Sequence, residues 1–177
     1  MGLVHLYYGD GKGKSTAAAG LMLRALGAGH KVTLVRLLKG GEPESGEARL
    51  LKKNGARVID GKPENGFASG FDREGKERLK LFQDGILKKL IEELSEPGTD
   101  KQEMLVLDEA LAACEMELVD EELVKELVKE GKKRAEIVLT GRNPRKWMLE
   151  EADYITQLKA ERHPYEKGIT ARKGIEY

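Results

Sequence analysis

The chain has little cysteine and no excess of charge of either sign. Its 177 residues include one cysteine, Cys114, which excludes an internal disulfide and a zinc ribbon built from several cysteines. We expect Cys114 to be a packing residue, because no neighbour in the sequence would obviously lower the pKa of its thiol. Lys plus Arg and Asp plus Glu number 31 each, so no basic excess favours nucleic acid as a partner.

Long hydrophobic runs are also missing. No apolar run approaches the length of a membrane span, and the N-terminus lacks the basic-then-apolar pattern of a signal peptide. These absences predict a cytoplasmic protein without a membrane partner. The length of the chain fits one domain with a sizeable core.

Short apolar runs alternate with longer stretches of helical period. This alternation predicts a single α/β domain over residues 1–177, a P-loop NTPase-like (RecA-like) fold with a mostly parallel sheet and helices on both faces. The expected strands are 3–8, 32–38, 57–59, 104–107, 137–140 and 154–158, and the expected helical segments are 15–28, 47–54, 72–94, 110–130 and 144–152. Residues 62–71 read as a functional loop, and residues 159–177 as a tail packed back on the domain.

A glycine-rich segment follows the first expected strand and indicates a site for a polyphosphate. Glycines permit positive φ and let backbone N–H groups surround phosphate oxygens, while the following helix directs its positive dipole end at the same anion. Lys14 supplies an ammonium group, and the Ser15 hydroxyl suits a bridging Mg²⁺. The strict pattern places its first glycine at position 8, where this chain has Tyr8, so the loop is a shortened variant. The nucleotide-binding candidates are Gly9, Asp10, Gly11, Lys12, Gly13, Lys14, Ser15 and Thr16.

Acidic and basic side chains follow other expected strands. Residues 104–107 lead directly to Asp108 and Glu109, which a buried strand would deliver to the carboxyl edge of the sheet, where ligands bind in open α/β folds. One of them can hold Mg²⁺ with Ser15, and the other can fix a further contact or a substrate group. Arg142 follows another strand and is expected to bind a phosphate or to pair with Glu109; the alternative is a solvated helix-capping residue.

The second expected strand ends at the same edge. Arg36 and Lys39 stand at its end, followed by a pair of glycines, and they are candidates for contact with the nucleotide or its acceptor.

Several motifs, taken in order, resemble the P-loop type of ATP:corrinoid adenosyltransferase. The resemblance spans nearly the whole chain, and the tail is its most specific element. The motifs are residues 9–16, Leu37-Leu38-Lys39-Gly40, Gly66-Phe67, Leu107-Asp108-Glu109, Leu139-Thr140-Gly141-Arg142, and a tail with His163-Pro164-Tyr165, Gly168-Ile169, Ala171 and Lys173-Gly174-Ile175-Glu176-Tyr177.

The resemblance implies that ATP donates its adenosyl group, in adenosylcobalamin biosynthesis or salvage. In this family the Co(I) of a reduced corrinoid attacks the 5′ carbon of ATP, a Co–C bond forms, and triphosphate leaves. Positioning and charge neutralisation would supply most of the catalysis. Lys14 and Glu109 are the implied catalytic residues, residues 11–16 would bind the triphosphate, and Mg²⁺ would bind near Ser15 and Glu109. The strand ends described above add Asp108 as a candidate metal ligand and Arg142 as a candidate nucleotide contact. A flavoprotein reductant and a homodimer are the further partners to be considered.

Phe67 is the third implied catalytic residue. In the family an aromatic pair crowds the lower face of the corrinoid, displaces its axial ligand and makes Co(II) easier to reduce. The second aromatic of the pair is often a tryptophan two residues later, where this chain has Ser69, and Phe71 is the available substitute.

Two alternatives share the phosphate loop. One is a nucleoside or small-molecule kinase on the same scaffold, and the other is a RecA-like ATP-dependent switch protein. A switch would need partner or nucleic-acid surfaces, and the neutral charge argues against nucleic acid. Neither alternative accounts for the tail from His163 to Tyr177.

Overall fold

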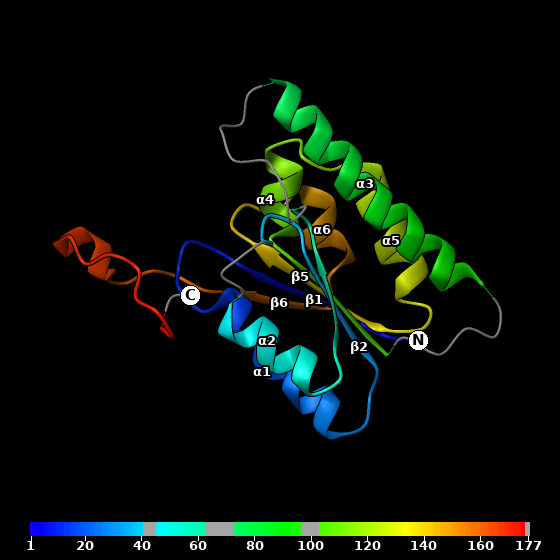
Figure 1. The fold of residues 1–177 in the computed structure, drawn as a ribbon, viewed down its shortest axis with the longest axis horizontal. Helices are drawn as coiled ribbons and strands as arrows, with labels where there is room; N and C mark the ends of the chain where they lie inside the picture. Colours follow the sequence, from blue (N-terminus) through cyan, green and yellow to red (C-terminus); the bar gives the residue numbers. More distant parts are fainter. Residues whose placement is uncertain (41–44, 63–72, 97–102, 176–177) are drawn as a thin grey trace.

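The strands form one parallel sheet. The structure is a computed structural model that describes residues 1–40, 45–62, 73–96 and 103–175. In this part of the chain the strands lie in the order β3-β2-β4-β5-β1-β6, and every neighbouring pair is parallel (Figure 1). Their bounds are β1 Val4–Tyr8, β2 Val32–Arg36, β3 Arg57–Asp60, β4 Met104–Asp108, β5 Glu136–Gly141 and β6 Tyr154–Gln157. The predicted α/β fold with a parallel sheet is confirmed.

Helices cover both faces of the sheet. Helices α1 and α2 lie on one face, and α3, α4, α5 and α6 lie on the other (Figure 1). The helix bounds are α1 Lys14–Gly27, α2 Gly46–Lys53, α3 Arg73–Ser95, α4 Ala110–Glu115, α5 Glu121–Gly131 and α6 Lys146–Glu151, with a short 3-10 helix η1 at Pro164–Lys167. No helix within the described ranges is both long and apolar enough to span a bilayer.

The helical segment expected at 110–130 is divided into α4 and α5. Glu117, between them, has a φ of 57°, which a continuous right-handed helix does not allow. Asp120 then caps α5, because its side chain accepts a hydrogen bond from the backbone N–H of Glu122 at 3.0 Å. The sequence Asp-Glu-Glu is the kind of start signal that marks this second helix.

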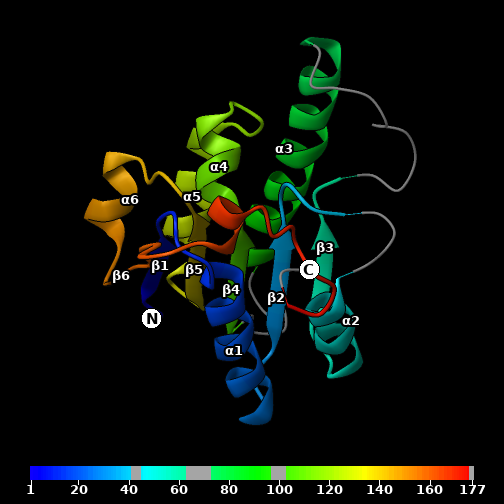
Figure 2. The same cartoon turned by 90° about the vertical axis from the view of Figure 1, so that its left-hand side faces the viewer.

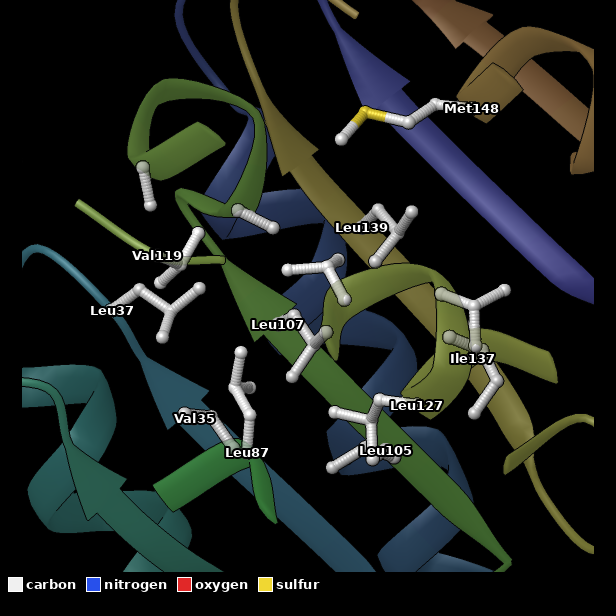
Figure 3. Packing of buried hydrophobic residues seen from close by; sticks show 14 of the residues in the cluster. Val35, Leu37, Leu87, Leu105, Leu107, Val119, Leu127, Ile137, Leu139 and Met148 are labelled. Carbon is white, nitrogen blue, oxygen red and sulfur yellow. The ribbon is translucent and has the colours of Figure 1, made fainter. Parts of the chain in front are cut away.

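Strand β4 shows why the core has two halves. Its side chains alternate between faces, so Leu105 and Leu107 join the cluster under α3 and α5, whereas Met104 and Val106 join the cluster under α1. Figure 3 shows the first of these clusters, where Leu87 of α3 lies beside Val35 of β2. Each fully buried leucine contributes about 1.5–3 kcal/mol through apolar burial. Burial on both faces therefore holds β4 firmly in the sheet.

Cys114 of α4 belongs to this core. It is buried, and burial raises the pKa of its thiol to about 12. A thiol with such a pKa stays protonated at neutral pH, so Cys114 is a packing residue.

The register of the strands aligns their carboxyl ends. Tyr8 at the end of β1 pairs with Gly141 on one side and with Gln157 on the other. Arg36 at the end of β2 likewise pairs with both Asp108 and Asp60. The residues that follow these strands therefore meet at one edge of the sheet.

The tail leaves the sheet at this same edge. After β6 it runs outward, drawn from orange to red, and Figure 2 views the molecule from that side. The side chains of residues 164–175 are exposed. The packing of residues 159–177 back on the domain stays a prediction.

Candidate active site

The phosphate loop joins β1 to α1 and is held against the exit of β6. The backbone N–H of Gly9 donates to the carbonyl oxygens of Gly141 and Arg142, and that of Gly11 donates to the carbonyl oxygen of Leu158 at 2.9 Å. These two amides are thus used inside the protein. The N–H groups of Lys14, Ser15 and Thr16 come before the first helical hydrogen bond, which the N–H of Ala17 donates to the carbonyl oxygen of Gly13 at 2.7 Å, so they are placed to bind an anion.

Two glycines of the loop are required by its shape. Gly9 has a φ of 118°, and an added Cβ there would lie 2.3 Å from the carbonyl oxygen of Leu158. Gly13 caps α1 with a φ of 115°, a conformation that L side chains rarely adopt. The close contact with the backbone after β6 is therefore enough to require glycine at position 9, with or without a bound phosphate.

Lys14, the first residue of α1, carries a charge that an anion would stabilise. Its ammonium nitrogen Nζ donates to the carbonyl oxygen of Gly11 at 2.7 Å. Burial lowers the pKa of Lys14, and the nearby guanidinium of Arg142 lowers this pKa further, while Glu109 acts in the opposite direction. An anion bound between the Lys14 and Arg142 cations would offset both unfavourable effects.

Asp108 is the centre of a hydrogen-bond network. Its side chain is only 6% exposed. Oδ1 accepts from the Ser15 hydroxyl at 2.8 Å and from the Thr140 hydroxyl at 2.7 Å, and Oδ2 accepts from Nζ of Lys39 at 2.8 Å. The first turn of α1, the turn after β2 and the end of β5, which are far apart in the sequence, thus fix the orientation of one buried carboxylate.

Glu109 holds an uncommon backbone conformation beside this network. Its φ is 62°, in the left-handed region, where it precedes the first residue of α4. Its N–H donates to the Thr140 hydroxyl oxygen at 3.0 Å, and its Oε1 lies 3.9 Å from Nζ of Lys39. Such strain persists where the surrounding structure enforces it, which is typical of functional positions.

The other sequence candidates lie at the rim or outside the described residues. Asp10 is exposed, and its Oδ1 accepts from the N–H of Ala160 at 3.3 Å, which ties the start of the tail to the loop. Lys12, Thr16 and Arg142 are exposed on the solvent side. Phe67 lies outside the described residues, as does Phe71.

Arg36 has a different place from the one expected. Its side chain is only 4% exposed; its Nε donates to Asp60 at 2.7 Å, and its Nη1 donates to the Ser45 hydroxyl at 2.9 Å. The Arg36 charge is therefore balanced inside the fold, where it joins β2 to β3 and to the start of α2.

Sequence reasoning gave too little weight to Lys39 and Thr140. Both contact Asp108, although they lie 69 and 32 residues away from it in the chain. The one available signal was that each is a polar residue at or just after the end of an apolar strand.

The oxygen atoms of Asp108 and of the hydroxyl beside it are suitable ligands for a small hard cation. Hydroxyl and carboxylate oxygens are the ligands that Mg²⁺ prefers, and the Lys39 ammonium group shows that a positive charge is accommodated here. Across the described ranges, no group of three or more His, Cys, Asp or Glu side chains is placed to hold a metal. Mg²⁺ at this place would thus complete its shell with phosphate oxygens and water.

Comparison with known proteins gives one consistent family. The sequence matches the family described as ATP:corrinoid adenosyltransferase BtuR/CobO/CobP over residues 1–177. It is 32% identical to the corrinoid adenosyltransferase of a Sinorhizobium species over 99% of this chain and 80% of that protein. It is 30% identical to the corrinoid adenosyltransferase of Escherichia coli K12 and to the corrinoid adenosyltransferase CobA of Salmonella typhimurium, in each case over 99% of this chain and 86% of the relative. The chain therefore belongs to the ATP:corrinoid adenosyltransferase family.

Proposed function

We propose that the sheet edge around Lys14 and Asp108 holds the triphosphate of ATP as a leaving group while the adenosyl group passes to a reduced corrinoid. Family membership supplies the reaction class. In the proposed step, Co(I) contributes both electrons of the new Co–C5′ bond. The electron pair of the broken C5′–O bond departs with the triphosphate, so cobalt ends as Co(III).

The convergence of cations and helix N–H groups on one edge carries this proposal. Lys14 is the first residue of α1, Arg142 is close enough to lower the pKa of Lys14, and the burial of Lys14 favours the binding of an anion there. Donors that are already in position before the reaction stabilise developing negative charge without reorganisation. We assign the neutralisation of the departing triphosphate to Lys14, Arg142 and the N–H groups that open α1.

We assign a Mg²⁺ site to Ser15, Asp108 and Glu109. The Ser15 hydroxyl donates a hydrogen bond to Asp108 at 2.8 Å, which brings two oxygen atoms that can bind a metal together next to the phosphate loop. When bound, Mg²⁺ would neutralise charge on the triphosphate. Thr140 would hold Asp108 in position through its 2.7 Å hydrogen bond.

Replacement of Lys14 tests the proposed site. Wild type and Lys14→Met are incubated with ATP and a chemically reduced corrinoid, and the light-sensitive organocobalt product is followed by its absorbance. We expect the variant to lose about 10³-fold in rate with its fold retained. The matched control is Lys146→Met, because Lys146 is 91% exposed and pairs with its helix neighbour Glu150. Equal rates in Lys14→Met and the control would contradict the assignment.

Phe67 is proposed to act on the corrinoid, on the strength of the family resemblance alone. If it displaces the lower axial ligand, Phe67→Ala should slow adenosylation mainly when the assay starts from Co(II). With Co(I) generated chemically beforehand, the variant should react close to the wild-type rate. Equal loss from both starting states would contradict this role.

The same resemblance supports three further proposals: a flavoprotein as reductant, a homodimer, and a cytoplasmic location. The first is tested by replacing the chemical reductant with a reduced flavoprotein and measuring the organocobalt product. Sedimentation of the purified chain tests the second, and cell fractionation tests the third. Failure of any one leaves the reaction class untouched.

A further inference from the structure

The ammonium group of Lys39 lies among the side chains that we assign to the metal. Its Nζ is 2.8 Å from Oδ2 of Asp108, 3.2 Å from Oγ of Ser15 and 3.9 Å from Oε1 of Glu109. A single positive charge is thus shared by the carboxylates and the hydroxyl that would contact Mg²⁺.

Asp108 needs a counter-ion in this position. The side chain of Asp108 is 6% exposed, and a buried carboxylate is strongly disfavoured unless it is paired and hydrogen-bonded. Ser15 and Thr140 supply neutral donors, so the charge is balanced by Lys39. A lysine ammonium is a compact point charge on a flexible stem, and it can take the place of a small cation.

The backbone that carries Lys39 is fixed by hydrogen bonds, whereas its side chain is partly exposed. The N–H of Leu37 donates to the carbonyl oxygen of Asp108 at 3.1 Å, and the N–H of Lys39 donates to that of Arg36 at 3.2 Å. These bonds tie the turn after β2 to β4. The side chain of Lys39 is 35% exposed, so its four-carbon stem has open space in which to move.

We propose that Lys39 is a built-in cation which occupies the metal position in the free enzyme and which Mg²⁺ displaces when it enters with the nucleotide. The inference rests on the metal site proposed above. A Mg²⁺ bound between Asp108 and Ser15 would lie close to the Lys39 ammonium, which contacts both of these side chains, and would repel it. In this arrangement metal binding requires the Lys39 ammonium to leave Asp108 and turn toward the exposed side of the site, since its side chain is 35% exposed. Lys39 is a positioning residue in this account, because it acts through Asp108.

Metal affinity, measured without corrinoid, tests the inference. Mn²⁺ is titrated into wild type, Lys39→Met and Lys62→Met in the presence of the β,γ-methylene analogue of ATP, and free Mn²⁺ is quantified by electron paramagnetic resonance. Lys62 is the matched control, since it follows β3 at the same edge, lies beside Gly40 and is half-buried. We expect Lys39→Met to bind Mn²⁺ about tenfold more tightly than wild type, and Lys62→Met to bind like wild type.

Unchanged or weaker Mn²⁺ binding in Lys39→Met would overturn the inference. Absence of Mn²⁺ binding in all three proteins, with adenosylation intact, would overturn both the metal site and the inference while leaving the reaction class standing. A merely structural role for Lys39 would lower stability without tightening metal binding.

A second measurement covers the case in which Lys39→Met does not fold. Lysine labelled with ¹³C at Cε is incorporated into wild type and into Lys39→Arg, and the signal missing from the variant identifies Lys39. Addition of Mg²⁺ with the methylene analogue should shift this signal beyond the shift caused by the analogue alone. A Lys39 signal that does not respond to Mg²⁺ would contradict displacement.

Discussion

Strands β4 and β6 reach the same edge of the sheet from opposite surroundings. All five residues of β4 are buried, and the strand ends at Asp108, whose carboxylate has partners on three other segments. All four residues of β6 are exposed, and among the strands that the structure describes it pairs with β1 at the edge of the sheet. The residue that follows β6, Leu158, supplies the backbone against which the phosphate loop rests. The buried strand β4 thus fixes the position of the Asp108 carboxylate, whereas the shape of the phosphate loop depends on the backbone that follows the edge strand β6.

Removal of the charge on β4 should have the largest effect. Asp108→Ala removes the acceptor of three side-chain hydrogen bonds and leaves the hydroxyl of the buried Thr140 without its acceptor, so we expect a loss of about 3 kcal/mol in stability. Adenosylation by the folded enzyme should also fall about 10³-fold, because the proposed metal contact is gone. Urea denaturation and the organocobalt assay measure the two effects separately.

Asp60→Ala is the matched control for this change. Asp60 pairs with the buried Arg36, so its removal should lower stability to a similar degree. The rate per folded molecule should stay close to wild type. If Asp108→Ala behaves in the same way, Asp108 has no part in the reaction.

A steric change on the β6 side should have the next largest effect. In Gly9→Ala the new Cβ would lie 2.3 Å from the carbonyl oxygen of Leu158, at a φ of 118°. We expect about 2 kcal/mol of destabilisation and a clear rise in the KM for ATP, because the loop must shift. Gly20→Ala is the control: Gly20 lies in α1 with nothing within 4 Å of an added Cβ, so stability should rise by about 0.5–1 kcal/mol. If Gly9→Ala is less stable but has the wild-type KM for ATP, the contact between Gly9 and Leu158 does not matter for nucleotide binding.

The pH dependence of ATP binding should report the charge of Lys14. Burial lowers the pKa of Lys14 in the free enzyme, and a bound triphosphate favours the charged form and raises this pKa. Between the two values binding takes up a proton, so affinity should fall as pH rises, by at most about tenfold per pH unit. Calorimetry of ATP binding without corrinoid gives this profile. Lys14→Met should bind weakly with a flatter profile, and an unchanged slope would assign the proton to another group.

The smallest expected effect concerns a buried polar group away from the site. Gln83 of α3 is fully buried, and its amide has no hydrogen-bond partner in the described part of the chain. Because an unsatisfied buried amide is destabilising, Gln83→Met should raise stability by about 1 kcal/mol. A thermal melt measures the change. A lower melting temperature for Gln83→Met would mean that the Gln83 amide has hydrogen-bond partners in solution.

The fold was predictable from the sequence because its signals are local. The apolar run before Asp108 and Glu109 identifies a buried strand, and Gly-Lys-Ser after a strand identifies the start of α1. The division of the 110–130 segment was missed, although Asp120 followed by two glutamates marks a helix start. Local patterns therefore give the elements, and cap residues correct their bounds.

The contacts within the candidate site were harder to predict. Lys39 and Thr140 reach Asp108 only because the register aligns the ends of β2, β4 and β5. Arg36 stands three residues before Lys39 yet is directed inward to Asp60. Sequence spacing does not reveal which of two neighbouring cations faces the ligand, since that depends on strand twist and on the side of the sheet each residue occupies.

The leaving group formed during turnover tests the central claim most directly. Wild-type enzyme, ATP and chemically reduced corrinoid are followed by ³¹P NMR, with the organocobalt product measured on the same sample. The account predicts intact triphosphate in equal amount to the light-sensitive organocobalt product. ADP and inorganic phosphate formed in step with turnover, without a Co–C bond, would contradict it.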